Sequence, residues 1–250
     1  MNIIHCITNE VTKNDVANII LAVGASPIMA HHIDEVEEVQ AFSKALLLNL
    51  GATYDYETML KAARIANNQG HAIVLDPVGV SGISFRRKFL KDLLNQIKVT
   101  CIRGNKAEIW AIIKDEKTGE GLDCENGKLI PADSELLQKM KEYSSEHDNI
   151  ILVASGELDL VTDGRNAACL QGGDPMMKRV TGMGCMSSGI LAACLSKVND
   201  TLEEGFYAVR NAVEKIGKAG ERAAETTRNL NGGTASFHMY FIDEVSKDIW

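Results

Sequence analysis

The chain has 250 residues, with 45% apolar and 24% charged side chains, which suits one large or two small globular domains and excludes disordered and fibrous proteins. Its formal net charge of −8 argues against nucleic acid or an anionic membrane as the main partner. No stretch approaches the roughly 20 apolar residues of a membrane span, and residues 1–10 lack the pattern of a signal peptide. The six scattered cysteines form neither a CxxC pair nor a zinc motif. We therefore expect a cytoplasmic protein with reduced thiols.

Short apolar runs alternate with helical stretches along the chain. The runs are typical of strands in a parallel sheet that is buried on both faces, and they cover residues 46–50, 71–75, 99–102 and 150–154. The helical stretches cover residues 56–69, 86–97, 134–146, 182–196 and 202–224. Residues 159–170 lack a helical period and contain the turn signal T-D-G-R, which predicts a hairpin. The alternation predicts βαβ units in an open, doubly wound α/β sheet.

Polar or glycine-rich residues stand at the end of each of the four predicted strands. They cover residues 49–51, 76–79, 103–105 and 155–157. In open α/β sheets, ligands bind beyond the carboxyl ends of the strands. We therefore expect these four segments to converge on one rim, which is the candidate site.

The sequence V-T-G-M-G-C at residues 180–185 precedes a stretch of small residues that is expected to be a buried helix. Gly182 and Gly184 would let the backbone approach an anion, which the first helical N–H groups and the helix dipole would then bind. This suits a phosphate whose charge grows during transfer. It is not a Walker A motif, because no G-K-[ST] follows. A tight turn with packing glycines is the alternative interpretation.

Cys185 is expected at or just before the N-terminus of that helix. Such a position lowers the pKa of a thiol and could make it reactive. The alternative is a small buried thiol with no chemical role. A thiol enzyme built on Cys185 also stays open at this point.

Arg103 and Glu108 flank the predicted start of another helix. Arg103 could pair with phosphate oxygens in a bidentate way, and Glu108, one turn into the helix, could reach Mg²⁺ through water. Asn105 and Glu108 also fit a helix cap with a capping-box partner, and both roles are compatible. Asp76 could serve the same ion through water, or it could simply be a turn residue before Pro77.

Six motifs occur in an order that resembles the hydroxyethylthiazole kinases of the ribokinase-like superfamily. They are H-C-I-T-N at residues 5–9, G-A-S-P-I-M-A at 24–30, N-L-G at 49–51, L-D-P-V-G at 75–79, I-R-G-N-K-A-E-I at 102–109 and V-T-G-M-G-C at 180–185. The resemblance covers about the whole chain. It implies a single ribokinase-like α/β domain over residues 1–250, with an open, mostly parallel sheet, helices on both faces and no separate lid. It also implies a homotrimer with active sites at the subunit interfaces.

The resemblance further implies roles for individual residues. Met29 and Gly182 would contact the thiazole, and Arg103 and Ser155 would contact ATP. Cys185 stands where most ribokinase-like enzymes carry an aspartate that activates the alcohol. In two places the chain departs from the family pattern. Ser155 replaces the usual threonine, and Met183 replaces an alanine between the two glycines, where it could crowd the substrate or reshape the anion hole.

The activity implied by the resemblance is transfer of the γ-phosphoryl group of ATP, with Mg²⁺, to the hydroxyethyl group of 4-methyl-5-(2-hydroxyethyl)thiazole in thiamine salvage. Gly182, Gly184 and Cys185 would form the catalytic segment. Two alternatives stay open. One is a kinase for a related pyrimidine or pyridine alcohol, and the other is a nucleotide-binding protein with weak catalysis.

Overall fold

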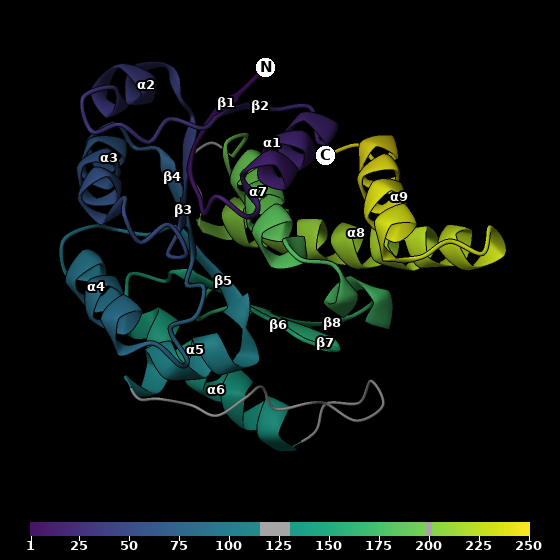
Figure 1. Cartoon of the computed structure of the whole chain (residues 1–250). Helices are drawn as coiled ribbons and strands as arrows, with labels where there is room; N and C mark the ends of the chain where they lie inside the picture. The colour runs from purple at the N-terminus through teal and green to yellow at the C-terminus, as the bar shows by residue number, and fades with distance from the viewer. Residues whose placement is uncertain (116–130, 199–201) are drawn as a thin grey trace.

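The structure is a computed structural model that describes residues 1–115, 131–198 and 202–250. In this part of the chain, eight strands form one sheet in the order β2-β1-β3-β4-β5-β6-β7-β8 (Figure 1). The strands are β1 (Ile3–Ile7), β2 (Ser26–Ile28), β3 (Ala45–Asn49), β4 (Ala72–Asp76), β5 (Cys101–Asn105), β6 (Ile151–Ser155), β7 (Leu158–Thr162) and β8 (Ala167–Gln171). One of the six cysteines, Cys124, lies outside the described residues.

The sheet is parallel from β2 to β6, and the β6–β7 and β7–β8 pairs are antiparallel, so β7 alone runs against the other strands. The predicted mostly parallel sheet is therefore confirmed, and the four predicted strands correspond to β3, β4, β5 and β6 within three residues at each end. The predicted hairpin is the β7–β8 pair. Its turn is closed by the Asp163 carboxylate, which accepts hydrogen bonds from the backbone N–H groups of Arg165 and Asn166.

Nine α-helices and one short 3₁₀ helix, η1 (Pro175–Arg179), surround the sheet in the described part of the chain. The α-helices are α1 (Lys13–Ala22), α2 (Val36–Phe42), α3 (Tyr56–Asn68), α4 (Ser84–Leu94), α5 (Lys106–Lys114), α6 (Pro131–Glu146), α7 (Met183–Leu195), α8 (Leu202–Asn229) and α9 (Thr234–Lys247). The five predicted helical stretches correspond to α3, α4, α6, α7 and α8. No helix in the described ranges is both long and apolar enough to cross a bilayer.

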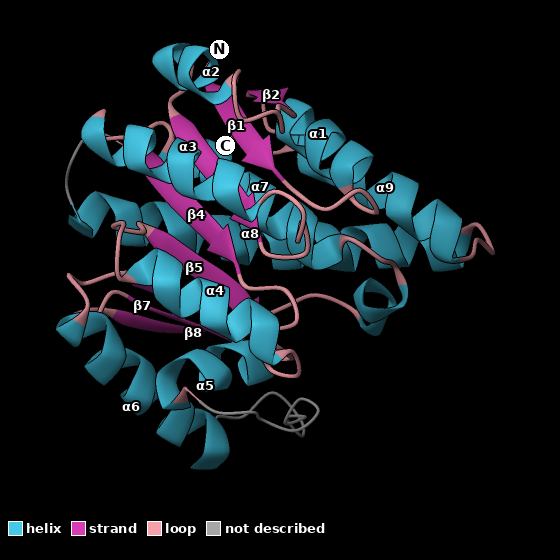
Figure 2. Cartoon of the chain, turned by 60° about the vertical axis from the view of Figure 1, so that its left-hand side comes forward, coloured by secondary structure: helices cyan, strands magenta, loops and turns pink. Residues whose placement is uncertain are grey.

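The strands alternate their side chains between two separate apolar layers. In β3, Leu47 packs into the layer of α1, α7, α8 and α9, whereas Leu46 and Leu48 pack into the layer of α2 to α6. Figures 1 and 2 show these two groups of helices on opposite faces of the sheet. Every residue of β3 is buried, because a parallel sheet covered by helices on both faces has no solvent-facing side.

The strand order reverses at β1. From β1 the chain passes through α1 to β2 on one side, and later strands add on the other side, starting with β3. The loops that follow β1 and β3 therefore diverge, and open α/β sheets bind ligands in the crevice that forms at such a point. Asn9 follows β1 and Asn49 ends β3, so both lie at this crevice.

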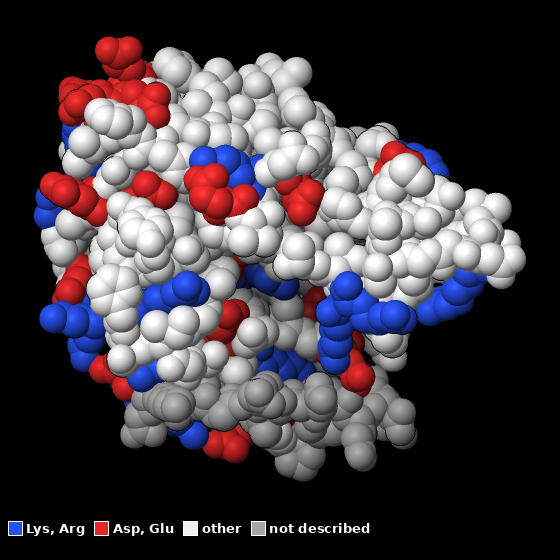
Figure 3. Space-filling view, in the orientation of Figure 1, with Lys and Arg blue, Asp and Glu red and all other residues white. Residues whose placement is uncertain are grey.

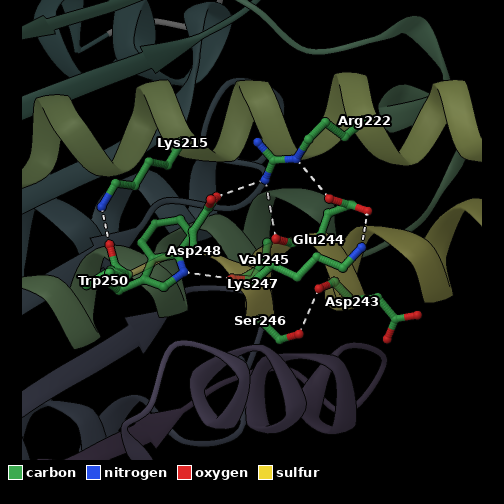
Figure 4. Close-up of polar contacts among 10 residues, drawn as sticks. Lys215, Arg222, Asp243, Glu244, Val245, Ser246, Lys247, Asp248 and Trp250 are labelled. Atoms are coloured by element: carbon green, nitrogen blue, oxygen red, sulfur yellow. Dashed lines mark hydrogen bonds and ion pairs between the residues drawn. The ribbon is translucent and has the colours of Figure 1, made fainter.

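The C-terminal segment is fastened to α8 by polar contacts (Figure 4). Arg222 of α8 binds the carboxylates of Glu244 and Asp248, at 2.8 and 2.9 Å. The Trp250 indole N–H donates to the Val245 carbonyl oxygen at 2.8 Å, and the Lys215 ammonium lies over the indole ring. These contacts hold α9 and the chain end against α8.

Candidate active site

The N-terminus of α7 faces the crevice and is open to an anion. Gly182 occupies the N-cap position with φ +85°, and no side chain caps the helix. Positive φ is the region that glycine adopts without strain. The next backbone N–H groups, from Met183 to Cys185, have no acceptor within the helix because of its geometry. The predicted glycine turn before a helix is therefore present.

Gly184 is required by the position of Arg103. A Cβ atom added at Gly184 would lie 2.5 Å from Nη1 of Arg103, so any larger residue here would push the guanidinium group away. The guanidinium group is therefore packed directly against the first turn of α7. A phosphate at this helix end would meet helix N–H groups and a guanidinium together, which is a strong arrangement for an oxyanion.

A cleft of about 620 Å³ opens in front of these groups. It is lined by Arg103 and Asn105 of β5, by Ser155 to Glu157 after β6, and by Gly182 to Gly184 at α7. Lysine and arginine side chains border the hollow on this face of the molecule (Figure 3). The structure thus brings together four predicted site residues from three separate segments, namely Arg103, Ser155, Gly182 and Gly184.

Cys185 lies beneath the cleft, in a network centred on Asn49. The Asn49 side-chain amide donates to Asp76 Oδ2 at 3.1 Å and to Cys185 Sγ at 3.2 Å. Its carbonyl oxygen accepts from the Gly51 N–H at 2.9 Å and from the Asn9 amide at 3.2 Å. The Asn9 amide also reaches Cys185 Sγ, at 3.7 Å. Asn49 therefore uses all its hydrogen-bonding capacity to join the ends of β1, β3 and β4 to α7.

Burial shifts the two titratable groups of this network. It is the main reason that the pKa of the Cys185 thiol rises to about 11, and the Asp76 carboxylate adds to the rise. The expectation of a lowered thiol pKa is therefore wrong, because desolvation outweighs the helix dipole. Burial also raises the pKa of Asp76 to about 6, although the Arg103 charge opposes this. The Ser188 hydroxyl donates to Asp76 Oδ2 at 3.0 Å.

Glu108 forms the predicted capping box at the start of α5. The Asn105 side chain accepts from the Glu108 N–H at 2.8 Å, and Glu108 Oε2 accepts from the Asn105 N–H at 2.9 Å. The other carboxylate oxygen, Oε1, accepts from the Gly79 N–H at 2.9 Å. Glu108 therefore also ties the loop after β4 to α5, which the sequence did not indicate.

Asp76 and Glu108 fit a magnesium ion that is held mostly by water. They are close enough for the Glu108 charge to raise the pKa of Asp76. Mg²⁺ keeps several waters and takes one or two carboxylates besides substrate phosphates. Across the residues that the structure describes, no group of three or more His, Cys, Asp or Glu side chains could enclose a metal. Asp76 and Glu108 are therefore the two carboxylates that would share an ion with bound phosphates.

Ser155 is the last residue of β6 and pairs with Asn105, the last residue of β5. The turn that follows is held by Asp159, whose carboxylate accepts from the Gly156 N–H at 2.8 Å. Burial raises the pKa of Asp159 to about 6, while Arg103 and Lys106 oppose the rise. The observed β5 and β6 end later than the predicted strands, because they include the polar site residues that the prediction placed just after them.

The two methionines of the predicted site lie in different places. Met183 is 7% exposed, packs into the apolar layer of α7 and lines the cleft. Met29 follows β2, the edge strand, and packs against the same layer without lining the cleft. Within one chain, therefore, the structure does not bring Met29 to the cleft that holds Arg103 and Ser155.

The far wall of the cleft was not predicted from sequence. It is built by Gln171 at the end of β8, by residues 172–174 of the following loop, by Pro175 and Met177 of η1, and by Val213, Ile216 and Gly217 of α8. A Cβ atom added at Gly217 would lie 3.3 Å from the backbone of Gly172, so the two segments touch through glycines. The G-G-D-P sequence at 172–175 is a turn signal that could have indicated a loop here, but no local pattern indicates its contact with α8.

Comparisons with known proteins agree with this geometry. The model of the hydroxyethylthiazole kinase family matches residues 1–248. Hydroxyethylthiazole kinase 1 of Methanosphaera stadtmanae is 40% identical over 252 residues, which cover 97% of this chain and 87% of that protein. The corresponding enzyme of Desulfovibrio desulfuricans is 37% identical over 254 residues, with 98% and 88% covered.

Solved structures share the fold. The hydroxyethylthiazole kinase protein of Pyrococcus horikoshii superposes with a TM-score of 0.85 at 30% identity, covering 99% of this chain and 88% of that one. A ribokinase-like superfamily protein of Enterococcus faecalis superposes with a TM-score of 0.68 at 11% identity, covering 98% and 87%. The second likeness concerns the fold alone. The predicted ribokinase-like fold is therefore confirmed, and no separate lid is present in the described residues.

Proposed function

The chain belongs to the hydroxyethylthiazole kinase family, and from this premise we propose how its residues carry out the reaction. As a kinase of this family, it transfers a phosphoryl group from ATP to the hydroxyethyl group of a thiazole, a reaction of thiamine biosynthesis. The observation that carries the proposal is the open N-terminus of α7 packed against Arg103. It places helix N–H groups and a guanidinium where a transferring phosphoryl group needs them.

In the proposed arrangement, ATP lies in the cleft with its phosphates toward α7. Arg103 and the Ser155 hydroxyl bind phosphate oxygens, because both line the cleft at adjacent strand ends. The N–H groups that follow Gly182 and Gly184 stabilise the phosphoryl group during transfer. Its transition state is loose, so positioning and electrostatics carry most of the catalysis.

The alcohol is proposed to lie beside Cys185, on the side of α7 that faces β1 and β3. The thiol is buried, and its pKa is raised to about 11 mainly by that burial, so it is neutral at physiological pH and a weak base. Positioning of the alcohol by Cys185 then matters more than proton removal. Gly182 would contact the thiazole ring from this side.

Three further properties are part of the proposal. Mg²⁺ would be held through water by Asp76 and Glu108, and when bound it would neutralise charge on the phosphate oxygens. The chain would form one domain over residues 1–250 and act as a homotrimer in the cytoplasm. In the trimer a neighbouring subunit would complete the thiazole site near Met29, which lies away from the cleft within one chain.

The test is ADP release by the purified protein with Mg-ATP, with and without 4-methyl-5-(2-hydroxyethyl)thiazole. We expect ADP release that depends on the thiazole, with an equal amount of thiazole phosphate identified by its mass. ATP binding without such turnover would reject this acceptor and return attention to a pyrimidine or pyridine alcohol.

A further inference from the structure

Thr12 lies between the N-termini of α1 and α7. It is 4% exposed and is the residue that precedes α1. A Cβ atom added at Gly182 would be 3.1 Å from Thr12 Cγ2 and 3.6 Å from Thr12 Cβ. Thr12 therefore packs on the glycine that begins the catalytic segment.

The hydroxyl of Thr12 is buried and makes no hydrogen bond of regular geometry to the described residues, although the Cys185 thiol is near enough to interact with it weakly. Threonine at an N-cap usually accepts from a helical N–H group, but Thr12 has φ −116° and ψ 5° and makes no such bond. An unmade hydrogen bond of a buried hydroxyl is costly, and such groups in native proteins have a reason. Here the Thr12 side chain lies beside the glycine at the N-terminus of α7.

The other polar side chains that contact Cys185 are already engaged. The Asn49 amide donates to Asp76 and to Cys185, and the Asn9 amide donates to Asn49 and to Cys185. The Thr12 hydroxyl lies beside the same thiol. Burial is the main cause of the raised pKa of Cys185, and the Thr12 hydroxyl acts in the opposite direction.

We propose that the Thr12 hydroxyl binds the oxygen of the acceptor alcohol and so positions it for attack. The inference rests on the proposed function, because it requires the alcohol to lie beside Cys185 and to face the phosphoryl group at the N-terminus of α7. A hydroxyl can donate and accept at once, so it can pair with a primary alcohol without displacing any bond of the Asn49 network.

Charge near Thr12 limits the class of acceptor. A Cβ atom added at Gly182 would lie 3.1 Å from Asp15 Oδ2, so a carboxylate lies on the same side of this glycine. The His238 ring is 3.3 Å from the other oxygen of Asp15. An anionic acceptor would be repelled by Asp15, whereas a neutral alcohol would not. The subsite is therefore suited to an uncharged primary alcohol.

The test compares Thr12→Val with Thr12→Ser. Valine keeps the shape and removes the hydroxyl, and serine keeps the hydroxyl. The Kd of 4-methyl-5-(2-hydroxyethyl)thiazole is measured by calorimetry without ATP, together with both KM values and the melting temperature of the free protein. For T12V we expect a rise of about three- to tenfold in the Kd and KM of the thiazole, because one net hydrogen bond to the alcohol would be lost. The KM for ATP should stay within about twofold of wild type.

The melting temperature separates a binding role from a structural one. Removal of an unpaired buried hydroxyl should leave it unchanged or raise it by roughly 2 °C. T12S should bind the thiazole like wild type. Thr227→Val is the matched control, because Thr227 is also buried but its hydroxyl donates to the Ala223 carbonyl oxygen within α8. T227V should not alter thiazole binding.

Two results would overturn this inference while leaving the proposed function intact. One is a T12V protein that binds the thiazole as tightly as wild type, and the other is a T12V protein with a lowered melting temperature and an equal rise in both KM values. Failure of the wild-type protein to bind the thiazole would instead reject the proposed function, and this inference with it.

Discussion

Cys185 stands where a base would be expected, yet its thiol is protonated at neutral pH. The Asn9 and Asn49 amides donate hydrogen bonds to its sulfur, and burial is the main cause that raises its pKa to about 11. These two amides are already placed to donate to a carboxylate. The site therefore provides two hydrogen-bond donors that would suit an aspartate, although the residue at this position is a cysteine.

We expect Cys185→Asp to keep or increase kcat, since the new carboxylate would be met by the two amides and would be a stronger base. Cys185→Ser should keep kcat within about tenfold of wild type, because a loose transition state needs little base catalysis. Steady-state kinetics of thiazole phosphorylation measure both. A loss of about a hundredfold or more in both variants would mean that the thiol itself takes part in the chemistry.

Asp159 should make stability depend on pH in a predictable direction. Its pKa in the folded protein is raised to about 6, mainly by burial, whereas an unfolded Asp titrates near 3.9. The folded state therefore binds the proton more tightly, and its free energy of unfolding falls as pH rises from about 4 to about 6. Asp159→Asn removes this effect and still accepts from the Gly156 N–H.

We expect D159N to match wild type near pH 4 and to be more stable by about 1–3 kcal/mol near pH 7. Urea unfolding at the two pH values measures the difference. Asp92→Asn is the control, because it makes the same chemical change at an exposed position. An equal stability difference for D159N at both pH values would mean that Asp159 is not perturbed.

At the scale of elements, the cleft depends on a close contact between α8 and the loop after β8. A Cβ atom added at Gly217 would lie 3.3 Å from backbone atoms of Gly172 and Gly173. The backbone of these two residues cannot move aside as easily as the end of a flexible side chain. The loop would move by a few tenths of an ångström, and residues 172–174 line the cleft.

We therefore expect Gly217→Ala to raise the KM for ATP by about three- to tenfold, since small misplacements of binding groups are costly. Gly205→Ala is the matched control in the same helix, because its Cβ would meet flexible side-chain ends, Cδ1 of Ile151 at 3.3 Å and Cδ2 of Leu195 at 3.7 Å. Both changes favour the helix by up to about 1 kcal/mol. An unchanged KM for ATP in G217A would show that this wall does not contact the nucleotide.

At the scale of the whole molecule, one chain holds the cleft that is proposed for ATP but leaves Met29 outside it. Several large apolar side chains are exposed in the described part of the chain, among them Val11 at 75%, Phe85 at 59% and Tyr54, which is fully exposed. Val11 precedes α1 and Phe85 lies in the first turn of α4. In the proposed trimer, a neighbouring subunit would cover some of these side chains.

Light scattering should therefore give a mass near three times the chain mass of 27.2 kDa. If a neighbouring subunit completes the thiazole site, dilution that dissociates the trimer should lower thiazole phosphorylation in parallel, because mass action links assembly to the complete site. Full activity in a species with the mass of one chain would reject the shared site.

The sequence by itself determined the features that depend on near neighbours along the chain. Apolar runs predicted β3 to β6, since burial on both faces requires apolar side chains at every position. Glycines before a helix predicted the open start of α7, and Asn105 with Glu108 predicted the capping box. The polar residues that follow these strands indicated where the candidate site lies, because parallel strands end at one edge of the sheet. Tertiary contacts then moved the strand boundaries by up to three residues.

Only the tertiary structure decided what surrounds these residues. Asn49 contacts Cys185 across 136 positions of sequence, and no local pattern encodes such a pairing. The thiol pKa was predicted in the wrong direction because the helix dipole is a local effect, whereas desolvation depends on every segment that packs over Cys185. The tertiary structure likewise decided the wall formed by α8 and the burial of the Thr12 hydroxyl, since burial is a property of the assembled molecule.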